Sequence, residues 1–290
     1  MPLFRSHKTK LLHGLTSTMR LLLPADPGQD RMLDAVRQFN PKATRSGHRI
    51  FVEGDSTMGV YIGPAVSVDA DLRSRAQLPP DVAVAFFVNW LRGHAALAGQ
   101  VFTDKYQQQV KDAAQLYREQ GTYLLGGLAA RFGGVSFPLA KEAGEPLHAD
   151  VFTRHWFNAE EFAQLVNGRL PGFGPVESEW PEHGVVALGG GGVPFGVEYW
   201  PPGAASIFRM DLSVRGAKAW QAAGSVGGDD GPMIVVRATR PAAGIDPGIA
   251  RAVGEAALGI AADTEGVCVD VFGFVVRSPG ELAIRRAASG

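Results

Sequence analysis

The chain has 290 residues, with 28 Lys and Arg against 29 Asp and Glu and a formal net charge of −1. This length allows one large domain or two modest ones, each able to bury a core. The near-neutral balance excludes the strong positive field that attracts nucleic acid, and no apolar run approaches the roughly 18 residues of a transmembrane helix, so we expect neither nucleic acid nor a membrane span.

The first half of the chain alternates short apolar runs with helical patterns. Residues 1–17 contain basic side chains and no acidic one, which predicts a basic N-terminal tail. Apolar runs closed by Gly and Pro predict strands at 19–23, 49–52, 59–62, 82–88 and 135–137. Helical spacing of apolar residues predicts helices at 29–39 and 104–132.

The second half begins with a helix signal. Asn158 is a typical N-cap, and Glu160 and Glu161 follow in the first turn, where the helix dipole favours acids. Segment 168–184 is rich in Gly and Pro, which predicts a linker. Beyond it, the pattern predicts strands at 185–188, 195–199, 207–212, 233–238 and 267–272 and a helix at 246–262.

Hairpin strands together with isolated strand–helix–strand units indicate an α+β fold. We expect two similar α+β halves, 18–167 and 185–290, each a mainly antiparallel sheet with helices packed on one face. A weak repeat supports this division, because aligning Gly134 with Gly266 places a helix end before an apolar strand in both halves. The alternative is that any strand–helix–strand unit ends its helix with Gly.

The segment Ile50–Met58 includes the block Gly54-Asp55-Ser56. This block resembles that of the SGNH (GDSL-type) esterase family, in which the serine follows the first strand and acts as the nucleophile. The resemblance implies a serine esterase with Ser56 as catalytic residue. A serine needs a base to take its proton, and the family's later Gly-x-Asn-Asp and Asp-x-x-His blocks are missing from this chain. A hairpin loop is therefore the expected structure.

A second candidate site combines imidazole and carboxylate groups that could bind a divalent metal. His148 and Asp150 would face the same way on an extended strand, and His155 follows shortly after. These residues have no fixed ligand spacing of the His-Glu-x-x-His kind. The alternative is a loop followed by a capped helix.

Aromatic residues gather in the 150–205 region. The binding candidates among them are Trp156, Phe157, Trp180, Tyr199 and Trp200. Rigid aromatic side chains suit a partner-binding face or a ligand cleft, and they equally suit a seam between two domains.

Because no coherent catalytic set is present, we expect non-catalytic binding of a protein partner or a small ligand at the junction of the two halves. A hydrolase at Ser56, or a metal enzyme at His148, Asp150 and His155, is the alternative, and a structural subunit of a larger assembly is the second alternative. We expect no cofactor and consider a homo-oligomer. The single cysteine, Cys268, fits a cytoplasmic location.

Overall fold

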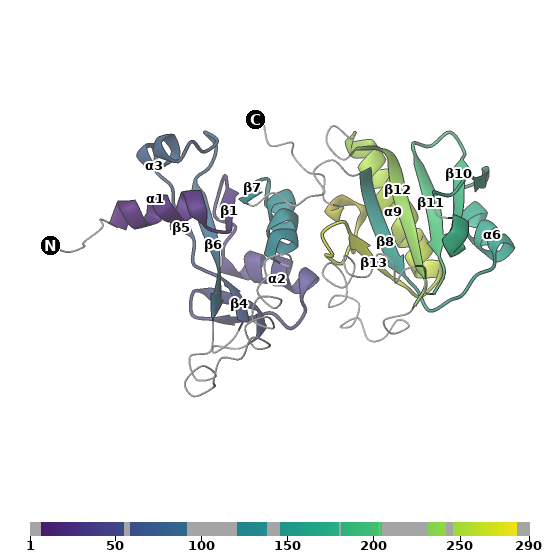
Figure 1. Ribbon diagram of the computed structural model, residues 1–290, viewed down its shortest axis with the longest axis horizontal. Coiled ribbons are helices and arrows are strands. Elements are labelled where there is room, and N and C mark those ends of the chain that lie inside the picture. Colours follow the sequence, from purple (N-terminus) through teal and green to yellow (C-terminus); the bar gives the residue numbers. More distant parts are fainter. Residues whose placement is uncertain are drawn as a thin grey trace. The chain divides into compact units, whose positions relative to one another are not determined.

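The structure is a computed structural model of the whole chain. It describes residues 7–54, 59–91, 121–137, 146–179, 181–202, 204, 231–241 and 246–282. The chain divides into two compact units, Met1–Ala140 and Lys141–Gly290, and each is built on an antiparallel sheet (Figure 1). The predicted α+β class with two sheet-based halves is confirmed.

The first unit contains a seven-stranded sheet. Its elements are α1 (His7–Ser17), β1 (Arg20–Leu23), α2 (Gln29–Phe39), β2 (Thr44–Ser46), β3 (Arg49–Gly54), β4 (Gly59–Ile62), β5 (Val66–Ser67), α3 (Ala70–Arg75), β6 (Val84–Leu91), the helical residues 121–132, and β7 (Val135–Phe137). The strand order is β2-β3-β4-β6-β1-β7, and β5 also pairs with β6. Because β1 lies inside the sheet, its three leucines are fully buried.

The second unit contains a six-stranded sheet. Its elements are β8 (Pro146–Phe152), α6 (Ala159–Arg169), β9 (Phe173–Val176), a 3-10 turn (Pro181–His183), β10 (Val186–Gly190), β11 (Phe195–Trp200), β12 (Met233–Pro241), α9 (Pro247–Asp263), β13 (Val267–Asp270) and a second 3-10 turn (Pro279–Glu281). The strand order is β13-β8-β12-β11-β10-β9. Helices α6 and α9 pack on one face, against alternate residues of β8 such as Ala149 and Val151.

The two sheets have the same topology. The first reads β7-β1-β6-β4-β3-β2 and the second β13-β8-β12-β11-β10-β9, so that each strand on these paths has a counterpart at the same place in the chain order, and the short β5 is an addition to the first sheet. In each unit the first strand of the sheet lies between the last strand and the strand that precedes the final helix. This agreement supports the internal repeat inferred from the sequence.

The two units agree most closely at the point where each final helix ends. Gly134 N–H donates to Ala129 O at 2.8 Å, and Gly266 N–H donates to Ala261 O at 2.7 Å. The residue before each glycine has a positive φ, 69° at Gly133 and 48° at Glu265, as expected for a helix ending in the left-handed conformation. Both helices therefore end in the same way, with a glycine directly before a strand that pairs with the first strand of its sheet.

The boundary between the units falls earlier than the predicted linker 168–184. That segment contains β9, which pairs with β10 in the second sheet, and the preceding β8 and α6 also belong to the second unit. The Gly and Pro residues that suggested a linker include those of β9, which is an edge strand of the second sheet. Pro175 is tolerated there because one side of an edge strand needs no ladder hydrogen bond. The predicted strand 207–212 and residues 104–120 of the predicted helix lie outside the described residues.

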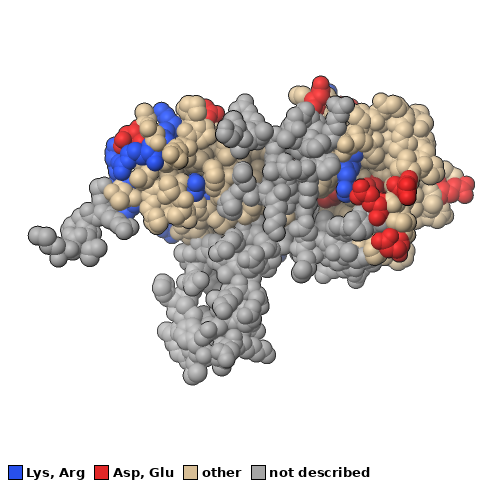
Figure 2. Space-filling model, turned by 45° about the horizontal axis from the view of Figure 1, so that its top comes forward, with Lys and Arg blue, Asp and Glu red and all other residues tan. Residues whose placement is uncertain are grey.

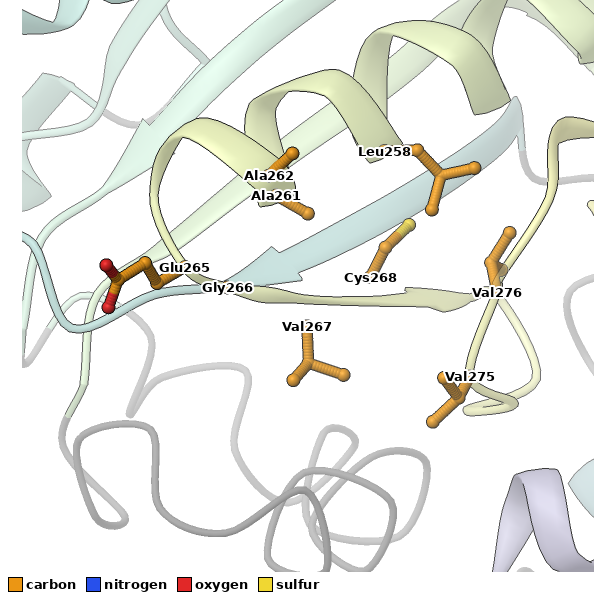
Figure 3. Close-up of a pocket in the computed structure, with 9 residues that line it drawn as sticks. All are labelled: Leu258, Ala261, Ala262, Glu265, Gly266, Val267, Cys268, Val275 and Val276. Carbon is orange, nitrogen blue, oxygen red and sulfur yellow. The ribbon is translucent and has the colours of Figure 1, made fainter.

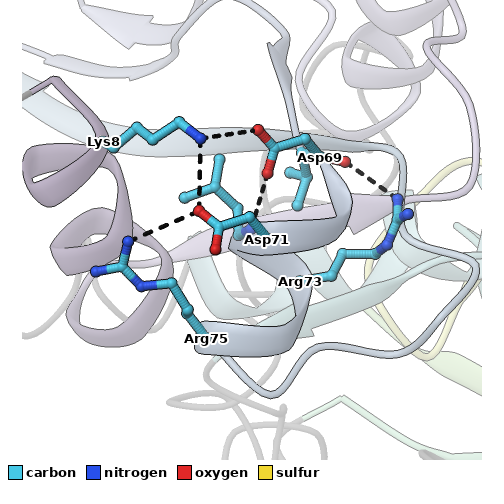
Figure 4. A network of polar contacts seen from close by, with 7 residues as sticks. Lys8, Asp69, Asp71, Arg73 and Arg75 are labelled. Atoms are coloured by element: carbon cyan, nitrogen blue, oxygen red, sulfur yellow. Dashed lines mark hydrogen bonds and ion pairs between the residues drawn. The ribbon is translucent and has the colours of Figure 1, made fainter.

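The described part of the predicted basic tail, residues 7–17, forms helix α1. Leu15 of α1 is fully buried in a cluster with Leu72 of α3 and Leu22 of β1. Lys8 Nζ lies 3.4 Å from carboxylate oxygens of both Asp69 and Asp71 (Figure 4). The pKa of the Lys8 ammonium is raised by these carboxylates, chiefly by Asp69. Part of the basic charge near the N-terminus is therefore neutralised by α3 and its N-cap.

Within the described ranges, no helix is long and apolar enough to cross a membrane.

Helices α6 and α9 are joined by an ion pair whose contribution depends on pH. Arg169 donates two hydrogen bonds to Asp263, at 2.5 and 2.6 Å, and these lower the pKa of the Asp263 carboxyl below its ordinary value. A carboxyl with a depressed pKa stabilises the fold above its unfolded-state pKa, and this stabilisation is lost as the pH falls through the folded-state value. Asp263→Asn should therefore lower the urea midpoint at about pH 7 and leave it unchanged at about pH 2. An equal effect at both pH values would contradict this assignment.

Candidate functional site

The turn between β8 and α6 exposes a tryptophan. Among the described residues, the large hydrophobic side chains that are exposed are Trp156, Val176 and Val193, and Trp156 is the most exposed at 72%. Arg154 and His155, which precede it, are also exposed. Tryptophan and arginine are enriched among the residues that dominate protein–protein binding energies.

Hydrogen bonds hold this turn on both sides of Trp156. On one side, the fully buried Thr153 hydroxyl donates to Thr264 O at 3.2 Å and accepts from His155 N–H at 3.0 Å. On the other side, Phe157 N–H donates to the Tyr199 hydroxyl oxygen at 3.1 Å. The backbone around Trp156 is thus fixed before any partner arrives, which reduces the entropy lost on binding.

A capping box completes the turn. Asn158 Oδ1 accepts from Glu161 N–H and Glu161 Oε2 accepts from Asn158 N–H, both at 2.9 Å. Two N–H groups at the start of α6 are thereby satisfied reciprocally. The helix signal found in the sequence is confirmed, and its N-cap lies two residues after the exposed tryptophan.

The other predicted aromatic residues that the structure describes do not share a surface with Trp156. Phe157, Phe162 and Tyr199 form a cluster on the helix side of the second sheet, with ring centroids 5.4–6.4 Å apart. Trp200 is 2% exposed and belongs to a cluster on the opposite face of the sheet, because neighbouring residues of a strand point to opposite faces. Trp180 lies outside the described residues. Of the four described candidates, only Trp156 is exposed.

Burial raises the pKa of the Tyr199 hydroxyl, and the hydrogen bond from Phe157 N–H lowers it in part. The hydroxyl therefore stays protonated and accepts this backbone hydrogen bond while its ring fills the core. Its role in the structure is to anchor the β8–α6 turn.

The predicted metal ligands are divided between a strand and a turn. His148 and Asp150 do face the same way on β8, with His148 Nε2 3.8 Å from Asp150 Oδ1, and both residues are buried. His155 lies on the exposed turn, with its ring centroid 6.3 Å from that of Phe157. In the part of the chain that the structure describes, no three His, Cys, Asp or Glu side chains gather to hold a metal ion. Ser56 lies outside the described residues.

His148 and Asp150 belong to a polar band across the sheet face that faces away from α6 and α9. Arg237 of β12 lies directly across from His148, and its Nη2 is 3.7 Å from Glu198 Oε2. Glu198 Oε2 also accepts from Trp200 Nε1 at 3.1 Å. The band pairs opposite charges on neighbouring strands, an arrangement that stabilises a sheet face.

A shallow groove of about 500 Å³ runs beside β13 (Figure 3). Helix α9 contributes Leu258, Ala261 and Ala262, and the strand side contributes Glu265, Gly266, Val267, Cys268, Val275 and Val276. Burial raises the pKa of the Cys268 thiol, helped by the nearby carboxylates of Asp150 and Asp270. Since the thiolate is the reactive form, Cys268 is an inert, protonated lining residue. Sequence reasoning missed this groove, although small residues late in α9 next to an edge strand could have indicated it.

Charge is unequally divided between the units. Met1–Ala140 contains 16 Lys and Arg against 11 Asp and Glu, whereas Lys141–Gly290 contains 12 against 18. Figure 2 shows red acidic side chains gathered over the second unit on the visible face, whereas blue basic ones predominate over the first. The near-neutral total therefore combines a basic unit with an acidic one.

No protein-family model, curated protein or solved structure matches this chain.

Proposed function

We propose that the protein binds another protein without catalysing a reaction, and that the binding surface is centred on Trp156. The observation that carries this proposal is a tryptophan that is 72% exposed on a turn held by buried hydrogen bonds. Exposing a large apolar side chain to water is unfavourable, by about 25 cal/mol per Å². A rigid turn that exposes a large apolar side chain is better explained by partner binding than by a contribution to stability.

The proposed surface differs from the junction of halves expected from the sequence. The sequence suggested that the aromatic residues form one binding surface. Phe157, Tyr199 and Trp200 instead pack into the interior of the second unit. Trp156 with its exposed neighbours Arg154 and His155 supports a surface on the second unit alone. We also propose a cytoplasmic location, which the single buried cysteine supports.

Photo-crosslinking at position 156 tests the proposal. Trp156 is replaced by a photoreactive phenylalanine analogue in the full chain, and Gln164, an exposed residue of α6, is replaced in the same way as the matched control. After irradiation of cells that produce each variant, we expect a discrete crosslinked species from position 156 that is missing from position 164. Identical patterns from both positions, or no adduct from either, would refute a binding surface at Trp156.

Once the partner is identified by mass spectrometry, its affinity can be measured with purified proteins. Trp156→Ala should weaken binding by roughly 30-fold, the effect of losing an interface hot spot worth about 2 kcal/mol. Because the side chain is exposed, the variant should unfold at the wild-type urea concentration. An unchanged dissociation constant would show that Trp156 lies outside the interface.

A further inference from the structure

A row of three glycines crosses the second sheet, over the neighbouring strands β11, β10 and β9 (Figure 1). Gly189 pairs with Gly174, and the register of β10 with β11 continues to Gly196, so the three glycines lie side by side. Arg237 of β12 pairs with Gly196 at one end of the row. The strand neighbours of these residues, such as Val197, point into the helix-side core, so the row lies on the face that faces away from α6 and α9.

The glycine row leaves space above the sheet. A Cβ atom at Gly174 would have no atom of the described residues within 4 Å, and one at Gly189 would first meet the side chain of Val176, 3.3 Å away. Val176 is itself 51% exposed. Glycine weakens the interior of a strand, and it often marks a place where a ligand approaches the backbone closely. The row spans two strand spacings, about 10 Å, which suits a flat bicyclic ring.

Arg237 gives an independent indication of a ligand beside the glycine row. Its Nε atom is buried and has no hydrogen-bond partner. Its Nη2 lies 3.7 Å from Glu198 Oε2, which is too long for a hydrogen bond, and Glu198 Oε2 accepts from Trp200 Nε1. The Arg237 and Glu198 side chains are 35% and 22% exposed, so they present a donor and an acceptor next to Gly196. Because their charges offset each other, the matching ligand is uncharged and carries an acceptor beside a donor.

The corresponding positions of the first unit carry aromatic rings. Counting through the strand pairings from the equivalent glycines at the two helix ends makes Tyr61 the counterpart of Gly196. By the same count, Phe51 corresponds to Gly189. The two rings lie 5.8 Å apart, and the Arg49 guanidinium lies over the Tyr61 ring, 5.0 Å from its centroid. This part of the fold therefore accommodates aromatic rings beside a guanidinium in the first unit, whereas the second unit has a guanidinium without the rings.

We propose that the glycine row binds a small, flat, uncharged heteroaromatic ligand whose edge carries a C=O group next to an N–H group. The ring lies on the backbone of the three glycines and against Val176. The C=O group accepts from the Arg237 guanidinium, and the N–H group donates to Glu198. The row is separate from the turn that carries Trp156, so this proposal goes beyond the proposed function and does not rest on it.

Isoquinolin-1-one is the probe, because it is a flat bicyclic ring with one such amide edge. Amide NMR of the full-length protein should show the resonances of Gly196, Gly189 and Gly174 shifting saturably on titration. We expect a dissociation constant of about 0.1–1 mM, the range for a good ligand of about eleven heavy atoms. The N-methyl derivative, which lacks only the donor, should bind at least about tenfold more weakly because it leaves Glu198 unpaired.

Two variants test the floor and the edge of the site. Gly174→Val should fold at least as well as wild type, since the position has room and valine suits a strand. It should bind isoquinolin-1-one at least about tenfold more weakly, because the new side chain occupies the place of the ring. Arg237→Met removes the donors and should weaken binding by a similar factor. Gly168→Val, the same change at an exposed position of α6, is the matched control and should leave the dissociation constant unchanged.

Equal affinity of isoquinolin-1-one for wild type and Gly174→Val would overturn the proposal, as would the lack of saturable shifts at the three glycines. Equal binding of the probe and its N-methyl derivative would also contradict it, since the amide edge would then not be recognised. None of these results bears on crosslinking at Trp156, so failure of this proposal and failure of the proposed function can be told apart.

Discussion

Gly134→Ala should lower the free energy of unfolding of the first unit by about 1–3 kcal/mol, because the new methyl group has no space. A Cβ atom at this position would overlap the backbone oxygen of Leu22 and the side chain of Leu23. Both belong to β1, which lies inside the sheet and cannot move without disturbing its pairs with β6 and β7. The glycine is needed for the close approach of the helix end to the sheet.

The equivalent change in the second unit should act in the same way. A Cβ on Gly266 would lie 2.6 Å from Phe152 O of β8, the counterpart of β1. Urea unfolding of each variant, followed by circular dichroism and intrinsic fluorescence, measures the effect. Each unit is analysed as its own transition where two appear, since two-domain chains need not unfold in one step.

Gly168→Ala is the matched control. Gly168 lies in α6 and has no atom within 4 Å of an added Cβ, so alanine should raise stability by about 0.5–1 kcal/mol through its better helix propensity. We therefore expect Gly134→Ala to lower the free energy of unfolding and Gly168→Ala to raise it. Stabilisation by Gly134→Ala would show that the helix end is further from β1 than the structure has it.

Asp270→Ala should destabilise the second unit by about 3–5 kcal/mol, because it removes a buried charged acceptor. Asp270 is 1% exposed, and its Oδ1 accepts from the N–H groups of Phe272 and Phe274 at 2.9 and 3.0 Å. Both phenylalanines are fully buried, so water cannot replace the lost acceptor. The change would leave two buried N–H donors unsatisfied in the turn after β13.

Asp270→Asn separates the acceptor from the charge. The amide oxygen can still accept from Phe272 and Phe274, so we expect a smaller loss, about 1 kcal/mol. Thermal and urea unfolding of the two variants side by side provide the measurement. If alanine and asparagine were equally destabilising, the hydrogen bonds to Oδ1 would not be the reason that Asp270 is buried.

Several local features followed from the sequence because they depend on residues a few positions apart. Asn158 and Glu161 form a capping box from positions three residues apart, and the helix ends before Gly134 and Gly266 follow from backbone conformation at one or two residues. Strand alternation alone places His148 and Asp150 on the same side of β8. These local rules sufficed to predict the α+β class, its antiparallel sheets and a repeat offset of 132 residues, from Gly134 to Gly266.

The tertiary structure decided what depends on segments far apart in the chain. Tyr199 and Trp200 are equally aromatic in sequence, and only the position of β11 between β10 and β12 determines which faces they occupy. The β8–α6 turn that carries the exposed Trp156 is tied to Thr264, more than 100 residues away in the chain. The groove exists because α9 ends beside β13. Local propensity reaches only a few residues along the chain, whereas burial and exposure depend on which distant segments come to pack together.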